Sequence, residues 1–137
     1  MQVEIVTPVG EKFSGEAVAV RARGMVGEFG VLPGHRDMLT ALGTGVCQVQ
    51  ETAHGEPVRF LLDEGYLQVS KDGRKVIIVT ELAERPQDID VNAARTAHDA
   101  AKSDLEANSE AVGTAAWKVK QHALDLARAR LELCGAL

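Results

Sequence analysis

The chain has 137 residues, of which 45% are apolar, and this suits one compact domain or one domain with an appendage. Its formal net charge of −5 argues against a nucleic-acid-binding protein, which neutralises phosphates with a concentrated basic surface. Only 4% of the residues are aromatic, so a core of Val, Leu, Ile and Ala offers few large anchors for a ligand, which disfavours a small-molecule enzyme.

The composition changes at Pro86. Residues 1–86 hold 13 valines, all four prolines and 11 of the 13 glycines, which is typical of short strands joined by tight turns. From residue 87 onward there are 13 alanines, no proline and two glycines, so helix is the favoured local conformation. We therefore predict two domains, residues 1–86 and 87–137.

Short strands recur through the first domain with no helix between them, which predicts an antiparallel β-sandwich or flattened barrel. In one of them Val18, Val20 and Ala22 occupy every second position, the period of a strand with one buried face. The segment Lys71–Arg74 contains Asp-Gly and predicts a hairpin turn. The strand candidates are residues 3–6, 16–23, 28–32, 38–42, 46–51, 58–62, 66–70 and 75–80.

Glycines at positions 24, 27, 30 and 34 give the segment 24–45 unusual backbone freedom. Within it, Leu32-Pro33-Gly34-His35 predicts a tight turn, because proline presets φ and glycine accepts positive φ. A phosphate-binding loop is disfavoured, since no helix follows the glycines. His35 has no serine or cysteine nucleophile in a recognisable motif, so we interpret it as a contact residue.

The second domain is predicted to be a helical hairpin with Asp90 as the N-cap of its first helix and a turn at Asn108 and Ser109. The first helix has a light apolar stripe and the second has two stripes, so its apolar face is broad. The first stripe is Ala94, Ala97, Ala101 and Leu105; the other two are Val112, Ala116, Val119, Ala123 and Leu126, and Leu124, Ala127, Leu131 and Cys134.

The charges of the two predicted helices differ. Residues 87–113 carry six acidic and two basic residues, whereas residues from 114 onward carry four basic and two acidic ones. One explanation of this difference is mutual attraction between the two antiparallel helices. Another is that the acidic helix holds the basic helix until an acidic partner competes for it. The sequence leaves both readings open. The basic residues are Lys118, Lys120, Arg128 and Arg130.

Cys47 and Cys134 form no Cys-x-x-Cys pair and have no histidines at ligand spacing, so we expect reduced thiols and no metal site. The start Met1-Gln2-Val3 lacks the basic-then-apolar order of a signal peptide. No apolar run approaches the roughly 20 residues that cross a bilayer. We expect a cytosol-facing protein that reaches a membrane only through a partner.

Five segments in order resemble the epsilon subunit of the rotary F-type ATP synthase over nearly the whole chain. They are VEIVTP at 3–8, FSGEAVAV at 13–20, GEFGVLPGH at 27–35, LLDEGYLQV at 61–69 and the final alanine-rich helical pair. The resemblance implies a sandwich of two five-stranded sheets followed by a C-terminal α-helical hairpin. It also implies a non-catalytic rotor subunit of the central stalk, which links the gamma subunit to the c ring and so couples ion translocation to ATP synthesis. Glu28, Gly34 and His35 would then face the ring.

The resemblance further implies that the hairpin can extend along gamma into the alpha/beta head and restrain ATP hydrolysis, with Lys118, Lys120, Arg128 and Arg130 as contacts. The subunit would be peripheral, on the cytoplasmic face of a bacterial inner membrane. The mitochondrial delta-type counterpart is the alternative identity, although no transit-like presequence is seen. A stand-alone β-sandwich binding module is a second alternative, but it does not account for the hairpin.

Some members of that family bind ATP through an Ile-Asp-x-x-Arg-Ala motif. Here the aligned segment is residues 89–94, and Ala93 stands where the arginine would be. Glu84, Asp90 and Arg130 could match parts of such a degenerate site. We therefore expect no cofactor, and weak or absent ATP binding.

Overall fold

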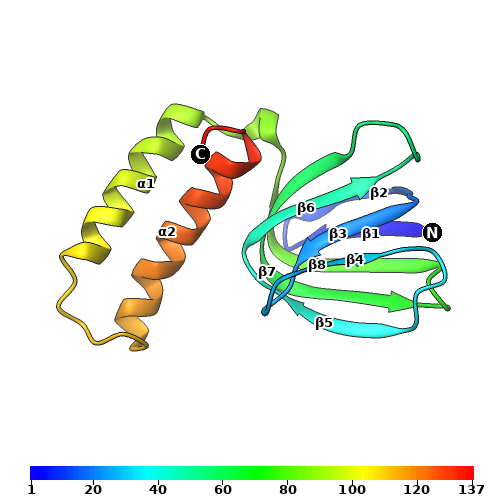
Figure 1. Ribbon diagram of the computed structural model, residues 1–137, viewed down its shortest axis with the longest axis horizontal. Helices are drawn as coiled ribbons and strands as arrows, with labels where there is room; N and C mark the ends of the chain where they lie inside the picture. The colour runs from blue at the N-terminus through cyan, green and yellow to red at the C-terminus, as the bar shows by residue number, and fades with distance from the viewer. The chain divides into compact units, whose positions relative to one another are not determined.

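A computed structural model describes all 137 residues, in two compact units that comprise residues 1–85 and 86–137 (Figure 1). The first unit contains eight strands and the second contains a 3₁₀ turn, η1, and two helices. The strands are β1 Gln2–Thr7, β2 Gly10–Glu16, β3 Ala19–Arg23, β4 Glu28–Val31, β5 Met38–Leu42, β6 Gly45–Gln50, β7 Val58–Ser70 and β8 Lys75–Glu84. The helical elements are η1 Pro86–Asp88, α1 Val91–Glu106 and α2 Ala115–Leu133.

The eight strands build two five-stranded layers because β7 and β8 each run through both. One layer has the order β2-β1-β8-β7-β5 and uses residues 75–79 of β8 and 65–70 of β7. The other has the order β4-β3-β6-β7-β8 and uses residues 58–62 of β7 and 82–84 of β8. The predicted fold class, a β-sandwich followed by a helical hairpin, is confirmed.

The strand β7 bends between the two layers at Glu64 and Gly65, which have φ values of 37° and 147°. A side chain at Gly65 would overlap the backbone of Val79, so only glycine fits there. The buried hydroxyl of Thr80 lies 2.8 Å from the carbonyl oxygens of both Asp63 and Glu64 and supports the bend. The sequence predicted two separate strands, at 58–62 and 66–70. In the structure they are the two halves of one continuous strand that bends at this point.

The strand β2 was missed, because it is an edge strand whose residues are mostly exposed and show no apolar alternation. The candidate at 16–23 was also wrong at its start. Glu16 ends β2, where it pairs with Gln2, and β3 begins at Ala19, which pairs with Gln50.

The core between the layers is aliphatic, as the composition indicated. Phe60 is its one fully buried aromatic side chain, and Phe13 contacts it edge to face at a centroid distance of 6.0 Å. Burial raises the pKa of the Cys47 thiol to about 12, so this thiol stays protonated at neutral pH. The largest fully buried aliphatic residues of the core are Val3, Ile5, Val20, Val31, Val49, Leu67, Val69, Val76 and Ile78.

The helical hairpin begins as predicted. The Asp90 carboxylate caps α1 by accepting hydrogen bonds from the backbone N–H groups of Asn92 and Ala93, at 3.0 and 3.1 Å. Thr114 caps α2 after Gly113 with φ of +90°, so the connection spans residues 107–114 and is longer than the expected Asn108-Ser109 turn. Val112 therefore precedes α2, which corrects its placement in that helix.

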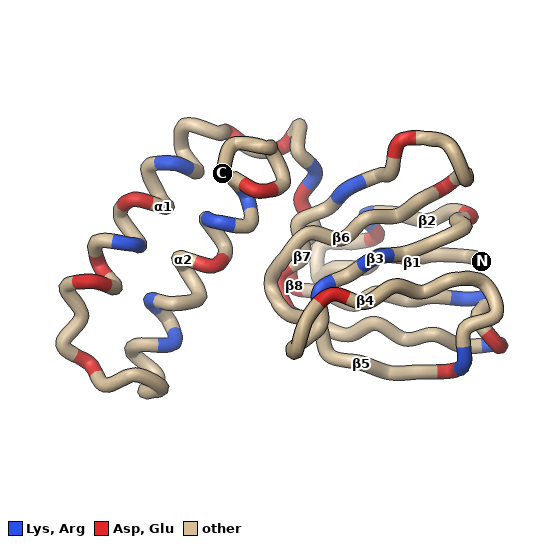
Figure 2. Tube along the Cα trace, viewed as in Figure 1, with Lys and Arg blue, Asp and Glu red and all other residues tan.

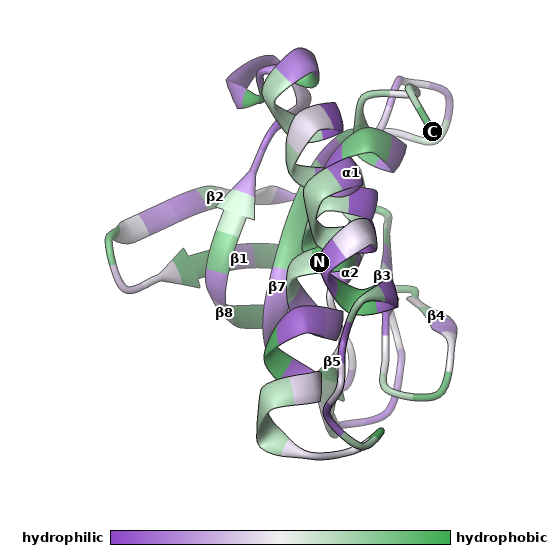
Figure 3. Cartoon of the chain, turned by 90° about the vertical axis from the view of Figure 1, so that its left-hand side faces the viewer, coloured by the Kyte–Doolittle hydropathy of each residue, from purple (hydrophilic) through white to green (hydrophobic).

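Two of the predicted apolar stripes need correction. In α1 the inward positions include Ala94, Ala101 and Leu105, with His98 and not Ala97 between them. At about 100° per residue, a side chain four positions after Ala94 lies about 40° from it around the helix, whereas one three positions later lies about 60° away. In α2 the stripe with Leu124, Ala127 and Leu131 is buried, whereas Val119 of the other stripe is 70% exposed. Apolar and polar bands alternate along both helices in Figure 3, as in helices with one apolar face.

Candidate functional site

The strands β4 and β5 are both sheet edges, since β4 pairs with β3 and β5 pairs with β7. Between them the sandwich is open and forms a groove of about 360 Å³, with one bridge from Gly24 to Leu42 near its end. Glu28 and His35 both line this groove, so two residues that the sequence analysis predicted to face a partner do lie together. The groove is also lined by Met25, Val26, Phe29 and Met38.

The predicted turn at Leu32–His35 closes through a hydrogen bond of 3.0 Å from the backbone N–H of His35 to the carbonyl of Leu32. Gly34 has φ of +90°, which fits the third position of a type II turn after proline. Gly34 is exposed and does not line the groove, whereas His35 is half-buried beside it. The turn thus presents His35 and supplies only backbone at Gly34.

The imidazole of His35 is oriented by a hydrogen bond to the backbone of the next residue. Its Nδ1 lies 2.7 Å from the carbonyl oxygen of Arg36, and a carbonyl oxygen only accepts, so Nδ1 carries the proton. The other ring nitrogen, Nε2, is not used in this hydrogen bond. A neutral ring would accept a hydrogen bond there, and a protonated ring would donate one.

A second surface lies on the outer face of the β5-β7-β8 layer and consists of Leu39, Tyr66, Gln68, Ile77 and Val79. Leu39 pairs with Gln68 and Tyr66 with Val79, so these side chains are direct or diagonal neighbours. Leu39, Tyr66 and Val79 are 68%, 59% and 51% exposed. We call this set the apolar patch.

Sequence reasoning missed the apolar patch. The available signal was the run from Val76 to Val79, in which every residue is apolar although alternate residues of a strand point to opposite faces. Val76 and Ile78 point into the core, and Ile77 and Val79 therefore point outward.

The four basic residues predicted to contact a partner are not equivalent. Figure 2 shows residues of both signs on both helices, with basic residues predominating along α2. Lys118 and Arg128 are exposed, but the Nζ atom of Lys120 lies 3.2 Å from Oδ1 of Asn108, and Arg130 is half-buried. At about 100° per residue, side chains two positions apart point in nearly opposite directions. The four residues therefore do not form one basic face.

Of the three residues proposed for a degenerate ATP site, Glu84 belongs to β8 in the first unit, and Asp90 and Arg130 belong to the second. The Asp90 carboxylate already accepts two backbone hydrogen bonds as a cap. Ala93 is exposed and provides no guanidinium.

Neither α1 nor α2 combines the length and the apolar character needed to cross a membrane.

Residues 1–86 match the family model of the ATP synthase delta/epsilon chain β-sandwich domain. Similar proteins include the ATP synthase epsilon chain of Trichlorobacter lovleyi, which is 36% identical over 136 residues and covers 98% of this chain and 94% of its own. That of Brevibacillus brevis is 39% identical over 105 residues, or 77% of each chain. A solved chain in the Euglena gracilis mitochondrial ATP synthase superposes with a TM-score of 0.79 at 24% identity, over 95% of this chain and 78% of that one, which shows a shared fold.

Proposed function

Because this chain belongs to the ATP synthase delta/epsilon family, we propose that it serves in the central stalk as the rotor subunit that joins gamma to the c ring. The family is a non-catalytic part of the synthase, so the chain is not itself an enzyme. The observation that carries the proposal is the similarity to bacterial epsilon chains across both units, at 36% identity over 98% of the chain.

The groove between β4 and β5 is our proposed contact with the c ring. It combines an exposed carboxylate, Glu28, with the imidazole of His35 and with apolar side chains from three segments. Such a mixed surface suits the loops of a membrane-embedded ring, where the carboxylate would meet polar or basic groups. Gly34 would allow the turn to approach closely, because it adds no side chain.

The apolar patch is our proposed contact with gamma. Contiguous exposed apolar side chains on one sheet face are unusual for a protein that acts alone, and a permanent stalk contact would cover them. The patch and the groove use different faces of the sandwich, since Leu39 belongs to the patch and its neighbours Met38 and Thr40 line the groove. One sandwich could thus hold both partners at once.

We further propose that the hairpin restrains ATP hydrolysis when it extends toward the alpha/beta head. Support comes from the light packing of α1, in which Ala94 is the one buried residue, and from the excess of basic over acidic residues in α2. A weakly packed element can exchange between two states of similar free energy. Lys118, Lys120, Arg128 and Arg130 would then meet acidic loops of the head.

The proposed location is peripheral, at the cytoplasmic face of a bacterial inner membrane and only as part of the complex. Relatives from bacteria that match across both units favour this over the mitochondrial delta-type counterpart. A stand-alone module is disfavoured for the same reason.

The test is reconstitution. The protein added to synthase stripped of its epsilon subunit should bind to the membrane-bound complex and restore ATP synthesis driven by the ion gradient. Failure to bind the stripped complex would overturn the proposed function.

A further inference from the structure

Two turns that are far apart in the sequence pack against each other in the sandwich. One is the ring-facing turn at residues 32–37, and the other is the hairpin turn at residues 71–74 between β7 and β8 (Figure 1). The hairpin turn predicted from Asp-Gly has positive φ at Asp72 and Gly73, 54° and 79°. Lys71 has φ of 55° as well, so the turn holds two non-glycine residues in an uncommon conformation.

The contact between the turns leaves no room for a side chain at position 73. A Cβ built on Gly73 would overlap the backbone nitrogens of Gly34 and His35, and Gly73 is buried. Backbone atoms cannot rotate aside as a flexible side chain can. A larger residue at position 73 would therefore displace the segment that carries His35.

A hydrogen bond ties the same two turns together. The backbone N–H of Asp72 donates to Oδ1 of Asp37 at 3.0 Å, across 35 positions of the sequence. Bonds from a backbone N–H to a carboxylate are stronger than bonds between neutral groups. This bond closes the far end of the turn at 32–37, and the Leu32–His35 hydrogen bond closes its near end.

We infer that Gly73 and Asp37 are positioning residues that preorganise the ring-facing turn without touching the partner. A turn that is already fixed loses less conformational entropy on binding, so its partner is held more tightly for the same contacts. This inference rests on the proposed contact between the groove and the c ring. It adds two residues that act through the position of the turn.

Two matched pairs of variants of the full-length protein test it. Gly73→Ala places a side chain against the Gly34 and His35 backbone, whereas Gly10→Ala changes a glycine that also has positive φ but has open space around it. Asp37→Ala removes the acceptor for the Asp72 N–H, whereas Asp37→Asn keeps an acceptor oxygen. The readouts are the Kd for detergent-solubilised synthase that lacks its epsilon subunit, the hydrogen exchange rate of the His35 amide, and the thermal midpoint.

We expect Gly73→Ala and Asp37→Ala to raise the Kd by about tenfold and to speed exchange of the His35 amide, with Asp37→Asn and Gly10→Ala within about twofold of wild type. Unchanged binding by Asp37→Ala, whether or not its thermal midpoint falls, would overturn the inference. The Asp37→Ala measurement also tests the inference if Gly73→Ala does not fold.

Glu28→Ala and His35→Ala separate this inference from the proposed function. If they weaken binding and Asp37→Ala does not, the ring contact stands and only the positioning role is wrong. If neither weakens binding, the groove is not the ring contact, and the inference is overturned with it.

Discussion

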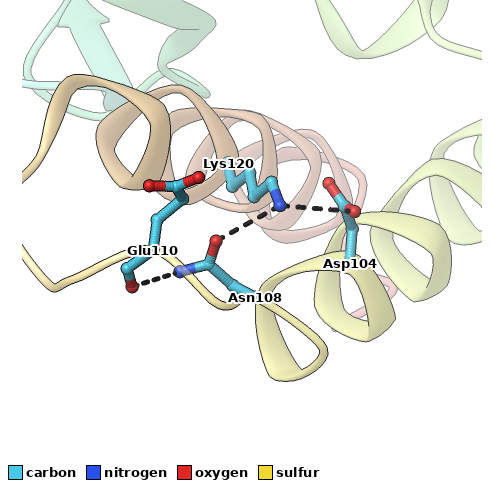
Figure 4. Close-up of polar contacts among 4 residues, drawn as sticks. All are labelled: Asp104, Asn108, Glu110 and Lys120. Carbon is cyan, nitrogen blue, oxygen red and sulfur yellow. Dashed lines mark hydrogen bonds and ion pairs between the residues drawn. The ribbon is translucent and has the colours of Figure 1, made fainter.

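The Nζ atom of Lys120 in α2 lies 3.8 Å from the carboxylate of Asp104 in α1 (Figure 4). The same ammonium donates a hydrogen bond to the side-chain oxygen of Asn108. The side-chain amide of Asn108 in turn donates to the carbonyl oxygen of Glu110 at 2.8 Å. This cluster links the two helices at the connection between them. One ion pair therefore contributes to the attraction between the helices here. Because Asp104 is largely exposed, the pair contributes about 0 to 1 kcal/mol, which an acidic partner could readily replace.

Lys120→Ala should loosen this end of the hairpin. We expect faster amide exchange at residues 104–120 and a loss of stability below about 1 kcal/mol, because the helices keep their other contacts. Lys118→Ala is the matched control, since Lys118 is exposed and lies two positions earlier in the same helix. Hydrogen exchange measured by mass spectrometry checks this, and equal exchange in both variants would contradict it.

Truncation after Asp88 should leave a folded sandwich that still supports coupling but no longer restrains hydrolysis. The reason is that residues 1–85 form a compact unit with its own core. Replacing Lys118, Lys120, Arg128 and Arg130 by alanine should reproduce part of that loss, because a basic helix is expected to engage acidic loops. The ATPase activity of reconstituted synthase measures both.

The control for these replacements is alanine at Arg95 and Lys102, which removes basic residues from α1 instead. If truncated and full-length complexes hydrolyse ATP at the same rate, the regulatory role of the hairpin is wrong.

Gly34→Val should weaken attachment of the catalytic head to the membrane sector more than it weakens folding. A β-branched residue at φ of +90° strains the turn by about 1 to 3 kcal/mol, although a Cβ there meets no other atom. Gly34→Asn is the control, because asparagine tolerates positive φ. ATPase retention on stripped membranes is the measurement, and full retention by the valine variant would argue against a ring-facing turn.

Replacing Tyr66 by serine in the apolar patch should weaken gamma binding and leave the thermal midpoint nearly unchanged, since this side chain is already 59% exposed. The neighbouring Leu67 is fully buried, so Leu67→Ala should instead cost about 2 to 5 kcal/mol of stability. Co-precipitation with purified gamma and thermal unfolding check the pair. Normal gamma binding by Tyr66→Ser would place the gamma contact elsewhere.

ATP binding by the isolated chain should be weak or absent. The guanidinium missing at Ala93 corresponds to about 1.5 to 3 kcal/mol, or roughly ten- to a hundredfold in affinity. Ala93→Arg should therefore raise the affinity by that factor, and Ala97→Arg, at another exposed position of the same helix, should not. Calorimetric titration measures both, and a micromolar Kd for the unaltered chain would refute the prediction.

The sequence by itself determined the features that depend on a few neighbouring residues. The type II turn at Pro33-Gly34, the hairpin turn at Asp72-Gly73 and the Asp90 cap all follow from φ preferences and from side chains that bond their own backbone. The change in composition at Pro86 likewise separates strand-forming from helix-forming residues, because these propensities are local.

Only the tertiary structure decided which distant residues those local features contact. Glu28 of β4 and His35, in the turn that joins β4 to β5, share a groove because β4 and β5 pair with different neighbours and leave two edges facing each other. The contact of Gly73 with Gly34 and the pairing of Lys120 with Asp104 depend on strand register and helix packing. Such pairings are set by which apolar faces are buried across the whole fold, and no short stretch of sequence specifies them.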